Sequence, residues 1–444
     1  MADPRATRVL GVVLGATLWA DGVWADPPAV RAPALPAVSQ APAEGPPRVS
    51  FAEAVALAMR SHPSVEAAEA QTRRAVALIT EARAALLPTV TANAIYTRLD
   101  DDRRLQDRII LAANQLSANV QAIVPIYSAR AWSGLHRAED NAALSRVAAL
   151  DARRSLGVAA ARAWVAVSSQ HRMVATTERA LDNGRAHHDF ARQRWEGGLS
   201  GRLDVVRAAQ DLATLRMTLA GQRAALARLQ EALGVLVGAD GPRDAVDDIV
   251  IGAVPSVGAA MEEAGRRGDV RVLTTRVHNA ERAVDASWAE YVPTLSAVLQ
   301  PFYQNPPSLT QPLTGWQAQV VLSWPIFDGG LRSGLAQERR AARDEARALL
   351  DGAIRQARSE VRAAVVGIRE ADTRAEAARE ASTLADEALG LAEAAYRAGA
   401  TGNLDVLDAQ RRARDARAAA FMAEDDAREA RLTLLVASGR FPPR

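Results

Sequence analysis

Four short segments of the chain alternate apolar and polar residues with a period of two, the pattern of β-strands that have one apolar face. They form two pairs, 89–98 with 115–126 and 294–303 with 316–327. Each segment is about ten residues long, the length that a tilted strand needs to cross a bilayer. In the last segment a single apolar residue, Val321, interrupts the polar face. The apolar face of that segment consists of Trp316, Ala318, Val320, Leu322, Trp324 and Ile326.

After each pair of strands the sequence becomes helical and stays helical over long stretches without proline. Long helices are predicted for 128–195 and 328–397, and shorter returning helices for 203–238 and 404–438. At about 1.5 Å per residue the second long helix would extend roughly 105 Å, which no ordinary globular core needs. Apolar residues at heptad spacing within it predict a coiled coil. The two seams are Leu350, Ala357, Ala364, Ala371 and Ala378, and Ile354, Val361, Ile368 and Ala375.

The chain contains an internal repeat with a spacing of about 200 residues. The first copy covers 49–238 and the second covers 270–439, with 239–269 as a mixed or irregular connector. Each copy has the order helix, strand, loop, strand, very long helix, turn, helix, and the first helix of copy one is predicted over about 51–86. The matching motifs are Val124-Pro125-Ile126-Tyr127 with Trp324-Pro325-Ile326-Phe327, Ser133-Gly134-Leu135 with Ser333-Gly334-Leu335, and Gly198, Gly201, Leu203 and Asp204 with Gly399, Gly402, Leu404 and Asp405.

The strand pattern favours a membrane barrel, although a half-buried hairpin of a soluble protein has the same alternation. Four strands cannot enclose a usable lumen, because even the smallest barrels have about eight, so the barrel must be shared between chains. The sequence therefore predicts a mainly α protein with membrane β-structure, in which long coiled-coil helices are joined to four strands of a shared barrel. Aromatic residues stand where the girdles of such a barrel would lie: Tyr96, Tyr127, Tyr303, Trp316 and Trp324.

The first 25 residues are predicted to be a secretory signal peptide, with Arg5 and Arg8 before a short apolar run and a cleavage site after Ala25. The alternative, a membrane anchor, needs about 20 apolar residues, more than the run provides. Residues 26–48 are proline-rich and predict an extended N-terminal tail. No later stretch is long and apolar enough for a transmembrane helix, so entry into a membrane requires a closed barrel.

Composition excludes several classes of function. The chain has no cysteine, which excludes disulfides, thiol catalysis and a lipid-modified N-terminal cysteine. Its 54 basic residues are all arginine, and their even mixing with 52 acidic residues predicts solvated helix faces instead of a nucleic-acid surface. Neither the histidines nor the glycines are spaced for a metal or a phosphate, so we expect no enzyme activity, cofactor or metal site. The histidines are His62, His136, His171, His187, His188 and His278.

The chain resembles the outer membrane efflux protein family, the TolC-like channels, over 51–439. The resemblance rests on the tandem duplication, on the opening motif 51–55, on the Pro-Thr steps into the strands, on the Pro-Ile-aromatic steps out of them, and on the segment 396–408. It implies a homotrimer with a twelve-stranded barrel in the outer-membrane lipid and a helical tunnel in the periplasm. It also implies that the hairpin tips dock on a periplasmic adaptor protein, which in turn is fed by an inner-membrane transporter. The tip residues that match are Gly198, Gly201, Leu203, Gly399, Gly402 and Leu404.

The same resemblance implies a gate at the periplasmic tips. Acidic residues there form rings that narrow the pore and favour cations, and the matching residues are Asp405 and Asp408, with Asp204 at the corresponding turn of copy one. Tyr396 matches a tyrosine of the closing network. The family prototype has an arginine five residues later, where this chain has Thr401; Arg202 or Arg397 could replace it. In the alternative interpretation, Asn403 caps the last helix and the aspartates only complement its positive N-terminal end.

Taken with the sequence pattern, the resemblance implies the passive exit duct of a tripartite efflux system for small toxic solutes. Two other functions share part of the pattern. The outlet of a type I protein secretion system has the same architecture, and the sequence does not separate it from an efflux duct. A soluble periplasmic coiled-coil adaptor would have the long helices without the four strands.

Overall fold

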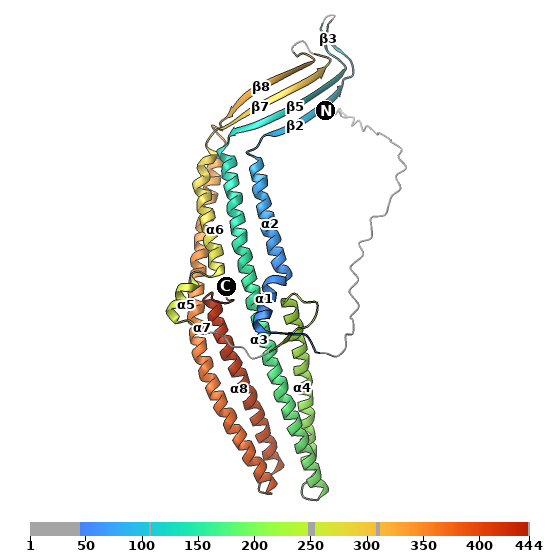
Figure 1. Ribbon diagram of the computed structural model, residues 1–444, viewed down its shortest axis with the longest axis vertical. Helices are drawn as coiled ribbons and strands as arrows, with labels where there is room; N and C mark the ends of the chain where they lie inside the picture. Colours follow the sequence, from blue (N-terminus) through green and yellow to red (C-terminus); the bar gives the residue numbers. More distant parts are fainter. Residues whose placement is uncertain (1–44, 106–107, 247–253, 308–310, 443–444) are drawn as a thin grey trace, which may run out of the picture. The chain divides into compact units, whose positions relative to one another are not determined.

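The computed structural model describes residues 45–105, 108–246, 254–307 and 311–442 (Figure 1). The predicted signal peptide and the tail up to residue 44 lie outside the described residues, as does the stretch 247–253 of the connector. All elements below belong to one compact unit, Pro46–Arg444.

Helices dominate the described chain, which confirms the predicted fold class. The two longest, α3 and α7, have 68 and 67 residues and therefore extend about 100 Å each. None of the described helices is both long and apolar enough to cross a membrane. The helices are α1 (Phe51–Ser61), α2 (Pro63–Ala84), α3 (Ala129–Glu196), α4 (Arg202–Leu236), α5 (Val257–Ala264), α6 (Gly268–Asp285), the 3-10 helix η1 (Ala286–Glu290), α7 (Leu331–Arg397) and α8 (Asn403–Ala437).

The four predicted strands form one antiparallel sheet in the order β2-β5-β7-β8 (Figure 1). Each copy of the repeat contributes a hairpin, and the β5–β7 pairing joins the two copies. The sheet strands are β2 (Thr89–Arg98), β5 (Asn114–Tyr127), β7 (Thr294–Asn305) and β8 (Thr314–Ser323). The remaining strands are β1 (Arg48–Val49), which pairs in parallel with β6 (Asp244–Ala245), and the hairpin β3 (Arg103–Leu105) with β4 (Arg108–Leu111).

The register of the sheet aligns apolar residues across all four strands. Residues directly opposite each other lie on the same face of a sheet. On one face, Ala92 lies opposite Val120, and Ala297 lies opposite both Val124 and Val320. The other face carries amide side chains, with hydrogen bonds from Asn93 to Asn119 (3.2 Å) and from Gln317 to Gln300 (2.6 Å). The sheet therefore has one mainly apolar face and one mixed face, on which the amide side chains lie beside apolar residues such as Ile123 and Val298.

A β-bulge near the end of β5 changes which face its last residue joins. Pro125 lies opposite Ser296 on the mixed face, but the register then shifts, and Tyr127 lies opposite Leu295 on the apolar face. An extra residue in one strand re-aims the side chains that follow it. Tyr127 is therefore on the apolar side of the sheet, where the helices begin.

Three features differ from the sequence-based prediction. The helix predicted over about 51–86 is divided into α1 and α2, because His62 before Pro63 adopts an extended conformation (φ −72°, ψ 135°). The strand predicted to reach residue 327 ends at Ser323, because its partner strand β7 begins at the residue opposite, Thr294. The charged loop after β2 contains the short β3–β4 hairpin, which the sequence analysis missed.

The long helices pack as two hairpins, α3 with α4 and α7 with α8 (Figure 1). The heptad seam of α7 is buried at Ala357, Val361 and Ala364, where α5, α6 and α8 pack against it. The corresponding core of copy one is built around Trp164, whose fully buried indole donates a hydrogen bond to the carbonyl of Val49 (2.9 Å). The connector between the copies contributes β6 and α5 at this level.

Candidate functional site at the helix-hairpin tips

The two hairpin turns have the same backbone geometry. Gly198 and Gly399 have φ values of +75° and +77°, a left-handed conformation in which glycine avoids the strain of a side chain. Gly201 and Gly402 are the N-caps of α4 and α8 in extended conformations, with φ of −83° and −82°. Backbone geometry therefore explains Gly198 and Gly399, whereas Gly201 and Gly402 have a conformation that other residues also adopt.

Leucine side chains project from both turns into solvent. Leu203 on α4 and Leu404 on α8 are exposed, and so is Leu199 in the first turn. Apolar side chains that remain exposed at a helix end can contact a partner protein. Two of these three leucines are among the predicted docking residues, and the structure leaves them accessible in the single chain.

Tyr396, on the last turn of α7, is buried between the two hairpins. It packs edge-on against Phe190 of α3 with ring centroids 5.8 Å apart. The guanidinium of Arg194, also on α3, lies 4.7 Å from the centre of the Tyr396 ring and donates a hydrogen bond to its carbonyl (3.1 Å). Burial raises the pKa of Tyr396, the charge of Arg194 lowers it, and the charge of Asp204 raises it, with a net upward shift. The phenol stays neutral, and its hydroxyl has no partner among the described residues.

Asn403 is the polar link between the copies. Its side-chain amide donates a hydrogen bond to the carbonyl of Asp204 (3.1 Å), and its Oδ1 lies 2.7 Å from Nε2 of His187. Both Asn403 and His187 are buried. The alternative interpretation, in which Asn403 caps α8, is wrong on this point: Gly402 occupies the cap position, and the Asn403 side chain crosses to copy one.

The three predicted aspartates have different surroundings. Asp405 accepts a hydrogen bond from the backbone N–H of Gly402 (3.2 Å), so it does complement the start of α8. Asp408 forms an exposed ion pair with Arg412 (2.8 Å). Asp204 is half-buried beside Tyr396 and contributes its carbonyl to the link with Asn403. Asp405 and Asp408 are thus exposed at the tip, while Asp204 belongs to the contact between the hairpins.

Neither arginine suggested as a replacement for the family arginine bridges the hairpins. Arg397 bonds to Glu393 of its own helix, and Arg202 is exposed. The hydroxyl of Thr401 is buried without a hydrogen-bond partner among the described residues. Arg194 supplies the cross-hairpin cation instead, from the opposite copy.

Sequence reasoning missed three residues of this site. His187, Phe190 and Arg194 lie three or four residues apart and therefore share one face of α3. Their spacing is the only signal in the sequence that could have grouped them. Their common partner, Tyr396, is revealed only by the packing of α3 against α7 and α8.

A second link joins the copies a short distance from the tip. The buried carboxylate of Asp211 on α4 lies 3.2 Å from Arg411 and 4.0 Å from Arg414, both on α8. Further along, Arg172 of α3 pairs with Asp425 of α8. The two hairpins are therefore held together by charged contacts as well as by the Tyr396 cluster.

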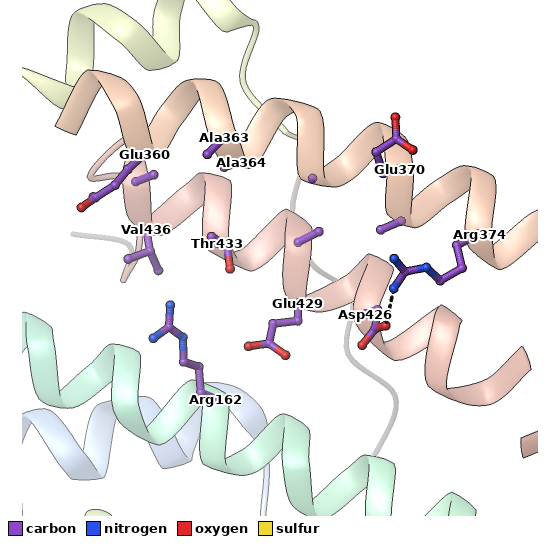
Figure 2. Close-up of a pocket in the computed structure, with 14 residues that line it drawn as sticks. Arg162, Glu360, Ala363, Ala364, Glu370, Arg374, Asp426, Glu429, Thr433 and Val436 are labelled. Carbon is purple, nitrogen blue, oxygen red and sulfur yellow. Dashed lines mark hydrogen bonds and ion pairs between the residues drawn. The ribbon is translucent and has the colours of Figure 1, made fainter. Parts of the chain in front are cut away.

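A groove of about 710 Å³ lies between α7, α8 and α3 (Figure 2). Arg162 points into it from α3, opposite Glu429 of α8, and Arg374 pairs with Asp426 at one end (3.3 Å). Its charges are of both signs, and small residues such as Ala363 and Ala364 line α7. Within the described residues, no group of three or more acidic or histidine side chains could hold a metal ion.

The fold and the tip together define a class: long-helix hairpins joined to a one-sided apolar sheet, with a closed contact between the hairpins. The family model of the outer membrane efflux proteins matches residues 54–239 and 261–440. The chain belongs to this outer membrane efflux protein family. Family membership places its sheet in the outer membrane and its helical part in the periplasm. The family consists of channel proteins, which agrees with the prediction that the chain is not an enzyme.

Relatives and solved structures agree with this assignment. The chain is 26% identical over 320 residues to the fusaric acid resistance protein FusA of Burkholderia cepacia, covering 66% of this chain and 59% of FusA. It is 28% identical over 279 residues to the outer membrane protein OprJ of Pseudomonas aeruginosa, covering 60% of this chain and 57% of OprJ. A solved membrane protein from Pseudomonas aeruginosa has the same fold, with a TM-score of 0.78, 22% identity, and coverage of 89% and 91% of the two chains.

Proposed function

We propose that three copies of this chain form the passive outer-membrane exit duct of a tripartite efflux system. The observation that carries the proposal is the sheet, whose apolar residues align across four strands into one continuous face. One chain supplies only four strands to this sheet, too few to close into a barrel. Three copies supply twelve strands, enough for a barrel with a lumen. The mixed face, with its amide side chains, would line that lumen.

The helices would continue the lumen through the periplasm. Two hairpins per chain give six hairpins per trimer, which side by side form a tube. Transport energy would come from an inner-membrane transporter, and a periplasmic adaptor would connect it to the tips. The glycine turns with Leu203 and Leu404 are the docking residues that we assign to that contact.

The Tyr396 cluster would hold this tube closed. Arg194 and Asn403 tie copy one to copy two within each chain, so the hairpins cannot move apart while these contacts persist. Opening would require the adaptor to bind the separated hairpins more tightly than the joined ones. The gate is thus a two-state element whose closed state is stabilised by contacts within the chain.

The substrate class that we propose is small toxic solutes. Support comes from FusA, whose name links it to resistance to fusaric acid. Deletion of the gene should increase sensitivity to such compounds, and secretion of proteins should be unchanged. If deletion instead abolished export of a polypeptide and left resistance intact, the secretion outlet would replace the efflux duct.

Conductance in a planar lipid bilayer tests the duct and its aperture. We expect discrete cation-selective channels from the purified protein. In the double variant Asp405→Asn/Asp408→Asn the channels should persist with a severalfold lower ratio of cation to anion permeability, because asparagine keeps a hydrogen-bond acceptor for the helix start but removes the charge.

The matched control is Asp351→Asn, which removes an exposed carboxylate from the middle of α7. Its selectivity should equal that of the unaltered protein. Equal selectivity in all three proteins would remove the aspartates from the aperture, and a folded protein that never inserts would refute the duct.

A further inference from the structure

A pocket of about 410 Å³ lies where the sheet meets the helices. The end of β5, the first turns of α3, the end of α6 and η1 form its walls. It is therefore a site between the two copies of the repeat, close to the helix-side edge of the sheet. The lining residues that matter here are Tyr127, Trp132, Arg137, Asp285 and Trp288.

The aromatic walls place the pocket at the membrane boundary. The β-bulge turns Tyr127 onto the apolar face, the side that meets lipid in an outer-membrane protein. Trp132 and Trp288 are 51% and 58% exposed, which is high for such large apolar side chains. Tryptophan and tyrosine gather at the level of lipid headgroups, because the ring is apolar and its N–H or O–H is polar. The pocket thus lies at headgroup depth in the leaflet that faces the periplasm.

The charged side chains of the pocket fall into two groups. Asp140 and Arg282 pair with each other at 2.8 Å and neutralise each other's charge. Arg137 and Asp285 also line the pocket, but neither has a hydrogen bond or ion pair with any described residue, and both are exposed. One pocket therefore offers one unpaired cation and one unpaired anion.

We propose that this pocket binds the headgroup of a zwitterionic phospholipid. The phosphate would be bound by the guanidinium of Arg137, since arginine forms strong charge-assisted hydrogen bonds to phosphate oxygens. The headgroup amine would be bound by the carboxylate of Asp285. Tyr127, Trp132 and Trp288 would contact the glycerol and the upper acyl chain. The site rests on the outer-membrane location of the sheet and is independent of what the duct transports.

Native mass spectrometry of the full-length protein, purified in mild detergent, tests this site. Phosphatidylethanolamine and phosphatidylglycerol with the same acyl chains are titrated in separate experiments. The unaltered protein should retain one phosphatidylethanolamine per chain more strongly than any further lipid. Arg137→Gln and Asp285→Asn should each weaken that binding about tenfold, because each removes one charge-assisted hydrogen bond. Asp285→Asn should leave phosphatidylglycerol binding unchanged, since that lipid has no amine.

Matched controls separate this site from general charge effects. Arg146→Gln and Asp351→Asn remove an exposed arginine from α3 and an exposed carboxylate from α7, both away from the pocket. They should retain phosphatidylethanolamine like the unaltered protein. Equal retention by all five proteins, or equal loss in the controls, would overturn the proposal.

Soluble ligands distinguish a lipid from a free phosphate. Inorganic phosphate and phosphoethanolamine should not displace the lipid at concentrations equal to it, because neither has an acyl chain to contact the aromatic walls. Displacement by either compound would assign the pocket to a soluble anion or zwitterion and overturn the lipid assignment. Bilayer conductance of Arg137→Gln should be normal, so a failure of this proposal leaves the proposed duct untouched.

Discussion

The two hairpin tips have the same turn geometry and opposite environments. Trp195 of copy one is 44% exposed, whereas Tyr396, at the equivalent position of copy two, is 5% exposed. Arg202 is exposed, whereas its equivalent Asn403 is buried. The two turns have equal backbone geometry, and the residues that differ beside them decide which tip is buried.

The reason lies on the facing helices. Copy one carries His187, Phe190 and Arg194 on the side of α3 that contacts copy two. The equivalent residues of copy two are small or aliphatic: Ala388, Leu391 and Ala395. One copy therefore supplies the enclosing side chains and the other supplies the enclosed ones. A contact of this kind needs two different surfaces, so it can form only after the copies have diverged.

The largest difference between the tips should appear when each aromatic residue is truncated. Tyr396→Ala removes a buried ring and should cost about 3–5 kcal/mol of local stability, whereas Trp195→Ala should cost less than about 1 kcal/mol. Hydrogen–deuterium exchange of tip peptides measures the local stability of both variants. Exchange should be much faster in Tyr396→Ala and nearly unchanged in Trp195→Ala. Similar exchange in the two variants would mean that the burial of Tyr396 does not hold the tips together.

Replacing the polar link should have an intermediate effect. Asn403→Ala leaves the imidazole of His187 and the carbonyl of Asp204 without their partner, which costs about 1–3 kcal/mol. In single-channel recordings the ratio of open to closed time should rise about tenfold or more. The equivalent change in copy one, Arg202→Ala, is the control and should leave the ratio unchanged. An equal rise of the open-to-closed ratio in both variants would contradict the inference that only copy two supplies the buried link.

The smallest effect is expected from Tyr396→Phe, because the hydroxyl that it removes has no partner among the described residues. The change in local stability should stay below about 1 kcal/mol. The variant should also alter the response to alkali. The pKa of Tyr396 is raised above its ordinary value of 10.0, so its contribution to stability is complete below that pH and is lost as the pH rises further.

Fluorescence at increasing pH, compared between the unaltered protein and the phenylalanine variant, detects the loss, because all other aromatic residues are common to the two proteins. Loosening above pH 10 should occur in the unaltered protein and be weaker in the phenylalanine variant. The same alkaline transition in both proteins would assign it to other groups.

The sequence predicted the sheet well because a strand records its two faces in consecutive residues. The alternation around Val120 and Val320 was sufficient to identify which residues share a face, and the register confirms it. Pro63 was a local signal for the break between α1 and α2. The helical pattern on both sides of this proline concealed the break. The β3–β4 hairpin lies in a charged segment without apolar alternation, so no pattern predicted it.

The candidate site was only partly predictable, for a different reason. The structure shows the Tyr396 ring buried, and its role in a closing network stays a prediction. Tyr396 itself was identified from the family resemblance. Its partners were not, because His187 and Asn403 are 216 residues apart and their contact depends on how α3 lies against α8. No periodicity within one helix records the position of another helix. The roles of Asp405 and Asp408 as an aperture remain predictions.

The pairing of β5 with β7 has a consequence for how the chain reaches its native state. The hairpins β2–β5 and β7–β8 each close a short loop, so each can form as soon as its own half of the chain is available. The seam between them joins residues from opposite halves, such as Val124 and Ala297, and must wait until the second half has emerged. Until then β5 has an unpaired edge, and a chain stalled at this stage would be most exposed to aggregation.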